Sequence, residues 1–414
     1  MKKLLVKNIG LLATPEGKSA HRGEEQGKIK FLKDAWVLIE DGIIASVGTG
    51  AVPACEGAEV VDAEGHLVTP GLVDAHTHLI FGGWRQNELG LKLHGASYLD
   101  IQNAGGGIQS TTNATRQASE QELAAKASKA LDEMMGFGTT TVEAKSGYGL
   151  ATEHELKALE VIKDLNDHHR MDLVATFMGA HLVPAEYKSN REEYVRLVCE
   201  EMMPKVKEQG IAKFCDVFCE ADTFTVEESR QVLEAGLKYG LRPKIHADEI
   251  EAIGGSVLAG GSQLAGEIGA ISAEHLIVCP PEGIASMAKG GVIACLLPAT
   301  SFNLGAVFAP ARDMVKAGVP VAMATDFNPG SCPCLNMQFV INLGCLKYKL
   351  TPEEVLTAVT LNGAAAIDLA DKVGSVEEGK LGDLVIWDAP DLDYICYRVG
   401  SNLAKTVIKR GEIV

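Results

Sequence analysis

Hydrophobic residues in the middle of the chain occur in short, near-continuous runs, and amphipathic stretches separate one run from the next. Such runs are typical of parallel strands buried on both faces, whereas the stretches between them have the spacing of helices, about 3.6 residues per turn. Eight strands alternating with helices predict a (β/α)8 TIM-like barrel, an α/β fold. The predicted strands lie within residues 71–78, 138–147, 172–181, 212–220, 242–249, 270–276, 291–300 and 319–330.

Several of the intervening helices carry a sequence signal for their first residues. In a capping box, Ser or Thr is followed three residues later by Glu, and each side chain accepts a hydrogen bond from the backbone of the other residue. We therefore expect helices to begin directly after such Ser or Thr residues. The candidates are Ser119/Glu122, Thr152/Glu155, Thr225/Glu228 and Thr351/Glu354.

The two ends of the chain have a different pattern, in which short apolar runs alternate with glycine-containing turns. This pattern is typical of short antiparallel strands. We predict a small β-sandwich module formed by residues 1–68 together with residues 374–414. The barrel, residues 69–373, is inserted between these two parts.

A doubly wound open sheet is the alternative α/β arrangement. It usually has a glycine-rich phosphate-binding turn after its first strand. Here the first strand ends in His-Thr-His. The nearby glycine cluster NAGGGI, residues 103–108, has no Lys-Ser or Lys-Thr pair after it. We interpret this cluster as a mobile loop, and the barrel remains the prediction.

Composition narrows the range of partners. The 414 residues include 38 Lys and Arg against 55 Asp and Glu, a net charge of −17, without a basic run that would follow phosphates. Nucleic acid and anionic membrane surfaces are therefore not expected partners. The ten cysteines are scattered, the start does not resemble a signal peptide, and no stretch has the apolar length of a membrane span. We expect a soluble cytoplasmic protein.

Polar residues stand at the ends of most predicted barrel strands. His76 and His78 are two positions apart, so in a strand they point to the same face. The carboxyl ends of all barrel strands meet at one face, where active sites of such barrels lie. One or two buried histidines satisfied by backbone carbonyls would be an ordinary structural alternative, but they do not explain polar ends on so many strands. The other strands end at His181, His246, Glu249, His275 and Asp326.

This inventory predicts a catalytic metal site. Three imidazole nitrogens and one carboxylate, from His76, His78, His246 and Asp326, suit one divalent ion, Zn²⁺ or Fe²⁺, with space left for water. A metal in such a site can activate water and polarise a carbonyl. Glu249, three residues after a ligand, is a candidate to accept and return the proton. His275 and Asp326 are candidates to assist, and which carboxylate is the principal base stays open.

The motif PGLVDAHTH, followed by a His after strand five, a His after strand six and an Asp after strand eight, resembles the amidohydrolase superfamily. The motifs HLIFGGWRQNE, EAKSGYGL, FMGAH, HADEI, SAEHL and ATDFNPGS are similar to those of its members that open the ring of 4-imidazolone-5-propanoate in histidine degradation. The resemblance covers nearly the whole chain. It implies hydrolysis of a cyclic amide to N-formimidoyl-L-glutamate by a homodimer acting on a small anionic substrate.

The resemblance also assigns residues. It implies the same four metal ligands as the strand ends do, and a single metal, because strand four ends in Cys219 and Glu220 without the carboxylated lysine of binuclear relatives. The guanidinium of Arg85 suits the propanoate group of the substrate. The implied substrate-contacting residues are Arg85, Tyr98, Tyr148, His181, Glu249, Asn328, Gly330 and Ser331.

Two other functions remain open at this stage. One is another mononuclear amidohydrolase, such as a guanine-type aminohydrolase, although a purine lacks the carboxylate that Arg85 suits. The other is a non-catalytic scaffold, which is disfavoured because the chain keeps the metal ligands together with Glu249 and His275.

Two further features of the sequence concern packing. A near-duplication within residues 254–267 is expected to lengthen the outer helix after strand five. Cys332 and Cys334, beside the predicted substrate loop, are interpreted as packing residues because no second cysteine pair lies nearby.

Overall fold

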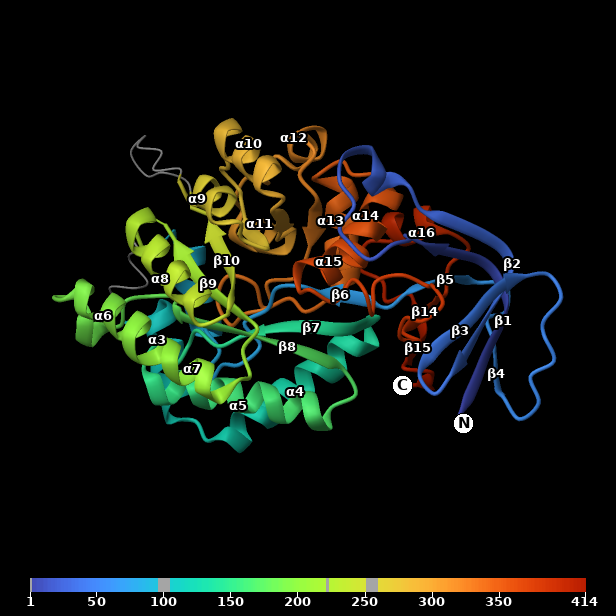
Figure 1. The fold of residues 1–414 in the computed structure, drawn as a ribbon, viewed down its shortest axis with the longest axis horizontal. Coiled ribbons are helices and arrows are strands. Elements are labelled where there is room, and N and C mark those ends of the chain that lie inside the picture. Colours follow the sequence, from blue (N-terminus) through green and yellow to red (C-terminus); the bar gives the residue numbers. More distant parts are fainter. Residues whose placement is uncertain (1, 96–104, 221–222, 251–259) are drawn as a thin grey trace.

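The computed structural model describes residues 2–95, 105–220, 223–250 and 260–414 (Figure 1). A barrel of strands and surrounding helices forms the larger part of the molecule. A separate β module lies at its side, built from strands at both ends of the chain, and both termini lie in this module. The predicted barrel and the predicted β module built from both ends of the chain are therefore present, and the strands of the module form one sheet.

The barrel consists of eight parallel strands that are hydrogen-bonded in sequence order. Each strand is followed by helical segments before the next one begins, which confirms the predicted alternation. The strands are β6 (Leu72–Asp74), β7 (Thr139–Lys145), β8 (Asp172–Ala180), β9 (Phe214–Cys219), β10 (Arg242–Ala247), β11 (Ser272–His275), β12 (Ile293–Leu296) and β13 (Val321–Met323).

The barrel closes between the segments that follow β6 and β13. Thr77 and Phe327 form a parallel bridge. The backbone N–H of Asp326 donates to the oxygen of His76 (3.0 Å), and that of His78 donates to the oxygen of Phe327 (2.9 Å). Closing the sheet thus places predicted metal ligands from the two ends of the barrel sequence side by side.

Helices surround the barrel strands (Figure 1). A π-helical turn, Val198–Met202, joins two of them. The described α-helices are α1 (Leu89–Leu93), α3 (Gly107–Gln117), α4 (Glu120–Gly136), α5 (Thr152–His168), α6 (Arg191–Leu197), α7 (Met203–Gln209), α8 (Val226–Lys238), α9 (Gly261–Ile268), α10 (Pro281–Gly290), α11 (Pro298–Leu304), α12 (Ala311–Lys316), α13 (Met337–Leu346), α14 (Pro352–Val359), α15 (Leu361–Ala366) and α16 (Leu392–Tyr397).

Three of the four predicted capping boxes are confirmed. Ser119, Thr225 and Thr351 cap α4, α8 and α14, and in each case both reciprocal hydrogen bonds are present. The fourth prediction, at Thr152 and Glu155, is wrong. Helix α5 already includes Thr152 and has no side-chain cap, because Glu155 turns away from the helix start and binds the preceding loop instead.

The β module is one eight-stranded sheet in the order β16-β15-β14-β5-β1-β2-β3, with β4 also paired to β1. The antiparallel pairing of β5 with β14 joins the two ends of the chain. The predicted limit at residue 68 falls inside β5, whose last residue still pairs with Leu384. The strands are β1 (Lys3–Thr14), β2 (Lys30–Glu40), β3 (Ile43–Thr49), β4 (Glu59–Asp62), β5 (Leu67–Pro70), β14 (Leu384–Trp387), β15 (Ala404–Lys409) and β16 (Glu412–Ile413).

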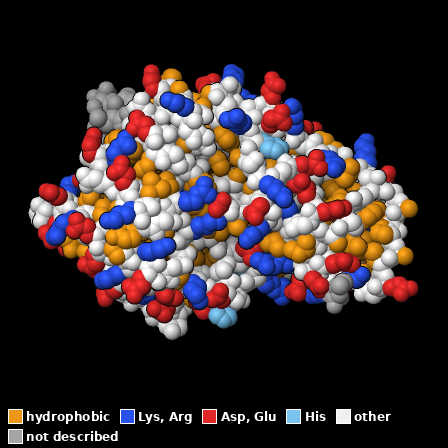
Figure 2. Space-filling model, in the orientation of Figure 1, with side chains coloured by type: hydrophobic (Ala, Val, Ile, Leu, Met, Phe, Trp, Pro, Cys, Tyr) orange, Lys and Arg blue, Asp and Glu red, His pale blue; other side chains and the backbone are white. Residues whose placement is uncertain are grey.

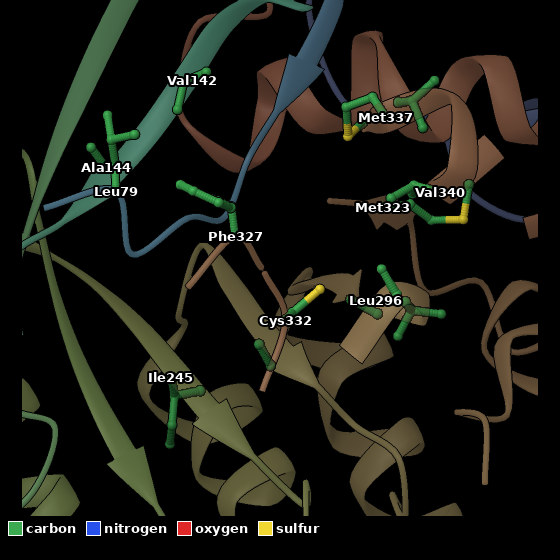
Figure 3. Close-up of a cluster of buried hydrophobic side chains, with 14 of the residues drawn as sticks. Leu79, Val142, Ala144, Ile245, Leu296, Met323, Phe327, Cys332, Met337 and Val340 are labelled. Atoms are coloured by element: carbon green, nitrogen blue, oxygen red, sulfur yellow. The ribbon is translucent and has the colours of Figure 1, made fainter. Parts of the chain in front are cut away.

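Apolar side chains of the barrel strands and of the surrounding helices form a buried cluster. Figure 3 shows part of it, including Ile245, Leu296 and Phe327. Cys332 belongs to it and is fully buried, which confirms its packing role. Cys334 is half-buried against the same cluster.

The near-duplication is described in part. Residues 254–259 of its first copy lie outside the described residues, and its second copy forms α9, which packs against α10 in the outer ring. None of the described helices combines the length and the apolar character that a membrane crossing requires.

Candidate active site

Four side chains converge at the carboxyl end of the barrel as a metal-binding set. The Nε2 atoms of His78 and His246 lie 3.3 Å apart. Oδ1 of Asp326 lies 3.5 Å from Nε2 of His76 and 3.6 Å from Nε2 of His78. Ligands about 2.1 Å from a tetrahedral ion lie about 3.4 Å from one another. These separations fit one divalent ion. His76, His78 and His246 form one group with mutually close ligand atoms, and His76, His275 and Asp326 form a second group, so His275 also lies at the metal-binding set. All of these side chains are buried.

Hydrogen bonds turn the correct ring nitrogen of two histidines toward this centre. Nδ1 of His76 lies 2.8 Å from Glu274, and Nδ1 of His246 lies 3.1 Å from Asp216. Since a carboxylate can only accept, each Nδ1 carries the proton and each Nε2 keeps a lone pair for a metal. Burial, followed by the charge of Lys145, holds the pKa of His76 well below its usual range, so the ring is neutral.

Asp326 is oriented in a similar way. The hydroxyl of Thr300 donates to its Oδ2 (2.7 Å), which leaves Oδ1 facing the histidines. Burial raises the pKa of this carboxyl to about 6. Asp326 and His275 both have left-handed backbone conformations, with φ of 57° and 69°. Such conformations in residues other than glycine are often found at functional sites.

Beneath the metal ligands lies a buried ionic network that the sequence analysis did not identify. Nζ of Lys145 lies 2.8 Å from Asp216 and 2.7 Å from Glu143, and all three side chains are fully buried. On the other side, Lys244 lies 3.3 Å from Glu274. Each carboxylate that holds a histidine is thus held by a lysine.

The network also determines the protonation state of Lys145. Burial alone would lower its pKa, but the charges of Asp216 and Glu143 outweigh burial and raise it. Lys145 is therefore protonated and paired with both carboxylates. A signal for the network was present in the sequence, because Glu143 and Lys145 alternate with apolar residues in a buried strand and so share one face.

Arg85 lies beside the loop that follows Asp326. Its guanidinium is largely buried, and Nε and Nη1 have no hydrogen-bond partner among the described residues. Its backbone N–H donates to Pro329 (3.2 Å). Oδ1 of Asn328 accepts from the backbone N–H groups of Gly330 and Ser331, both at 2.8 Å, and so shapes this loop. Two donor-bearing nitrogens of a buried cation are thus left to bind an anion.

Aromatic rings line the site next to His78. The ring of His181 stacks on His78 at 4.8 Å, and the ring of Tyr148 lies 5.2 Å from His181. Nδ1 of His181 donates to the backbone oxygen of Gly147 (2.8 Å). Burial, and then the neighbouring His246, lowers the pKa of His181 to about 3. The ring is therefore neutral and presents Nε2 as an acceptor.

Glu249 and His275 complete the group of titratable side chains. Oε2 of Glu249 lies 3.5 Å from Nε2 of His275. Burial, followed by the charges of Asp326 and Glu220, raises the pKa of Glu249 well above its usual value. The backbone N–H of Glu249 donates to Glu220 (2.9 Å), which fixes its position. A carboxyl with a raised pKa readily accepts and returns a proton.

The structure therefore brings together nearly all the residues that the sequence analysis singled out; Tyr98 lies outside the described residues. The residues gathered at this end of the barrel are Arg85, Tyr148, His181, Glu249, His275, Asn328, Gly330 and Ser331, besides the four metal ligands.

Two solved structures with similar folds have low sequence identity to this chain. The structure superimposes on guanine deaminase from C. acetobutylicum with a TM-score of 0.71 and 18% identity, over all of both chains. It superimposes on a zinc-bound adenosine deaminase from Xanthomonas campestris with a TM-score of 0.72 and 21% identity, over all of this chain and 92% of the other. At such identities these similarities support the fold alone.

Sequence comparison gives the family. A model of the amidohydrolase family matches residues 67–414. The chain is 51% identical to the imidazolonepropionase of Alkaliphilus metalliredigens and 49% identical to that of Geobacillus kaustophilus. In both cases the match covers all of this chain and 98% of the relative. The amidohydrolase family and the buried His-Asp set together indicate a hydrolase with a divalent metal. The chain belongs to the amidohydrolase family and, within it, to the imidazolonepropionases.

Proposed function

We propose that this protein hydrolyses 4-imidazolone-5-propanoate to N-formimidoyl-L-glutamate, a step of histidine degradation. In this reaction the oxygen of water bonds to the ring carbonyl carbon, the amide C–N bond breaks, and a proton passes to the departing nitrogen. The observation that carries the proposal within the site is Arg85, a buried cation whose Nε and Nη1 lack partners among the described residues. A guanidinium placed in this way suits the carboxylate of the propanoate.

The metal would be held by His76, His78, His246 and Asp326, and Zn²⁺ and Fe²⁺ both suit these ligands. When bound, such an ion polarises a carbonyl and lowers the pKa of water toward neutrality.

The other side chains have distinct roles in the proposed mechanism. Glu249 accepts the proton of the attacking water and delivers it to the departing nitrogen, for which its raised pKa is suited. His275, beside Glu249, holds the carbonyl oxygen by a ring N–H. Asp326 assists the proton transfer, and burial keeps its pKa near 6.

Substrate recognition is assigned to the surrounding walls. Tyr148 and the neutral ring of His181 contact the imidazolone ring, with Nε2 of His181 as the acceptor. The loop of Asn328, Gly330 and Ser331 contacts the substrate beside Arg85.

A direct assay tests this function. The metal-loaded protein is incubated separately with 4-imidazolone-5-propanoate and with guanine, and the products are measured by mass spectrometry and by ammonia release. We expect N-formimidoyl-L-glutamate from the first substrate and no ammonia from the second. Ammonia from guanine without turnover of the imidazolone would reject the proposal in favour of an aminohydrolase.

We further propose that the protein acts in the cytoplasm as a homodimer, with a small molecule as its partner and without nucleic acid or a membrane surface. The net charge of −17 supports the absence of nucleic-acid and membrane partners, as do the interspersed acidic and basic side chains on the face shown in Figure 2. Light scattering of the purified protein should give twice the chain mass, 43.9 kDa for one chain. A monomeric mass would contradict the proposed dimer.

A further inference from the structure

A buried carboxylate outside the site binds the loop that carries Tyr148. Oε1 of Glu155 accepts hydrogen bonds from the backbone N–H groups of Gly149 (2.8 Å) and Leu150 (2.7 Å). Its Oε2 accepts a third from Gly147 (3.0 Å). The side chain of Glu155 is fully buried, and hydrogen bonds to an ionised acceptor are about twice as strong as neutral ones. Glu155 therefore binds the backbone both before and after Tyr148.

Arg116, from the last turn of α3, binds the same loop through its carbonyl groups. Its Nε donates to the oxygen of Gly149 (2.7 Å), and its Nη2 donates to the oxygen of Leu150 (3.0 Å). Gly149 and Leu150 are thus bound at both their N–H and their C=O groups, by side chains of two helices. Glu155 and Arg116 are together called the loop clamp below.

The loop has a backbone conformation that requires such support. Leu150 has a left-handed conformation with φ of 50°, and Gly147 has φ of 81°. A non-glycine residue in this region costs about 1 kcal/mol or more. A Cβ at Gly149 would lie 2.6 Å from the backbone N of Glu155, so the loop also packs tightly on the start of α5.

The clamped loop determines how two residues face the site. The oxygen of Gly147 accepts the Nδ1 proton of His181, which leaves Nε2 as the acceptor directed to the site. The ring of Tyr148 packs against His181 (5.2 Å) and against the metal ligand His78 (5.8 Å). A shift of the loop would therefore move Tyr148 and remove the bond that selects the tautomer of His181.

The other end of α3 is connected to the segment of Arg85. Glu88, three residues after Arg85 and buried, accepts the backbone N–H of Gly107, the first residue of α3 (2.7 Å). One helix is thus hydrogen-bonded at its start to the segment of the anion-binding arginine, and at its end to the loop of Tyr148.

We propose that Glu155 and Arg116 are positioning residues for substrate binding, which hold Tyr148 in place and keep Nε2 of His181 available as an acceptor. This inference rests on the proposed function, because it takes Tyr148 and His181 to contact the imidazolone ring. Neither clamp residue touches the site itself. The contribution of Glu155 and Arg116 to substrate binding should therefore depend on the presence of Tyr148 and His181.

The primary variant is E155Q, which keeps the shape of the side chain but loses its charge and one acceptor oxygen. The matched control is E122Q, in the capping box of α4, where Glu occupies the same position of the same sequence motif but faces solvent. We expect KM of E155Q to rise about tenfold with kcat changed less than about threefold, and we expect E122Q to behave as the wild type. Metal content should be the same in all three proteins.

A double-mutant cycle separates positioning from general destabilisation. In a Tyr148→Ala background, E155Q should raise KM by only about threefold or less instead of about tenfold, because one of the positioned groups is missing. An equal effect of E155Q in both backgrounds, or an unchanged KM in E155Q, would overturn the inference. If E155Q does not fold, Arg116→Met gives the same test, and Arg116→Lys should restore part of the loss.

Hydrogen exchange of the backbone tests the clamp without reference to the substrate. In E155Q the amides of Gly147, Gly149 and Leu150 should exchange faster, and in E122Q they should not. If the wild type does not turn over the imidazolone, the proposed function fails while this measurement still decides whether the clamp holds the loop. Unchanged exchange in folded E155Q would overturn the clamp whatever the substrate is.

Discussion

A Cβ atom at position 330 would lie 1.1 Å from Nη2 of Arg85, so the guanidinium of Arg85 occupies the space that any side chain at Gly330 would need. The backbone of Arg85 also donates to Pro329, the neighbour of Gly330 (3.2 Å). The absence of a side chain at position 330 therefore determines where the proposed anion-binding group lies.

This contact predicts the effect of Gly330→Ala. The added methyl displaces the guanidinium of Arg85, and a hydrogen bond to a charged group is worth about 1.5–3 kcal/mol. We expect KM for 4-imidazolone-5-propanoate to rise about ten- to hundredfold, measured by steady-state kinetics, with metal content unchanged. Gly136→Ala, at the end of α4 where a Cβ meets nothing within 4 Å, is the control and should leave KM as it is. An unchanged KM in Gly330→Ala would contradict the role of Arg85.

The buried lysine beneath the metal ligands gives a second prediction. Lys145→Met leaves the carboxylates of Glu143 and Asp216 without their cation, and breaking a buried ion pair costs about 3–5 kcal/mol. Because Asp216 holds Nδ1 of His246, metal affinity should also fall, by about 10–100-fold. Thermal unfolding and competition with a chelator measure the two effects.

Lys163→Met is the control for this substitution, because Lys163 pairs with Asp167 on the surface of α5. Removal of an exposed pair should change the unfolding free energy by less than about 1 kcal/mol. If Lys145→Met loses stability but keeps wild-type metal affinity, the lysine supports the fold and not the ligand His246.

Metal affinity should depend on pH through Asp326. Burial raises the pKa of this carboxyl to about 6 in the absence of metal, and a protonated carboxyl must lose its proton to bind. Burial lowers the pKa of His76 and His78 far below 6.5, so these rings do not compete for protons in this range. We therefore expect constant affinity above about pH 6 and a decrease of about tenfold per pH unit below it.

The same shift has a consequence for the stability of metal-free protein. The folded pKa of Asp326 lies above its unfolded value, so the contribution of Asp326 to the free energy of unfolding is fully present below pH 3.8 and is lost as pH rises to about 6.

Chelator competition between pH 5 and 8 measures the pH dependence of the metal affinity. A decrease clearly steeper than tenfold per pH unit between pH 6.5 and 5 would indicate that a histidine ligand is protonated together with Asp326.

Metal analysis of gently purified protein should give about one divalent ion per chain, because the fourth barrel strand ends at Cys219 and is followed by Glu220, without a lysine that could bridge a second ion. Chelation should lower the melting temperature, and Zn²⁺ or Fe²⁺ should restore it, since a ligand at a thousand times its Kd stabilises by about 4 kcal/mol. Two ions per chain would contradict the mononuclear site. Substoichiometric metal without effect on melting would favour a non-catalytic scaffold.

The barrel and its ligand set were predictable from local pattern. Apolar runs followed by His or Asp identify strand ends, and the parallel arrangement requires those ends to meet, as they do for His76 and Asp326. Local pattern failed at Glu155. It stands in the same motif as Glu122, but tertiary contact with the Tyr148 loop replaced the expected cap.

The chemical groups at the ends of the strands could be predicted from local sequence, because the repeating alternation of strand and helix is a local property of the chain. How these groups are held follows only from the folded barrel. His76 is bound by Glu274, 198 positions away, and Lys145 holds the partner of His246 from another strand. Such contacts depend on barrel closure and on burial, which determine charge, tautomer and distance together. The spacing of residues along the chain shows that Glu143 and Lys145 share a face, but not which side chains of other strands they meet.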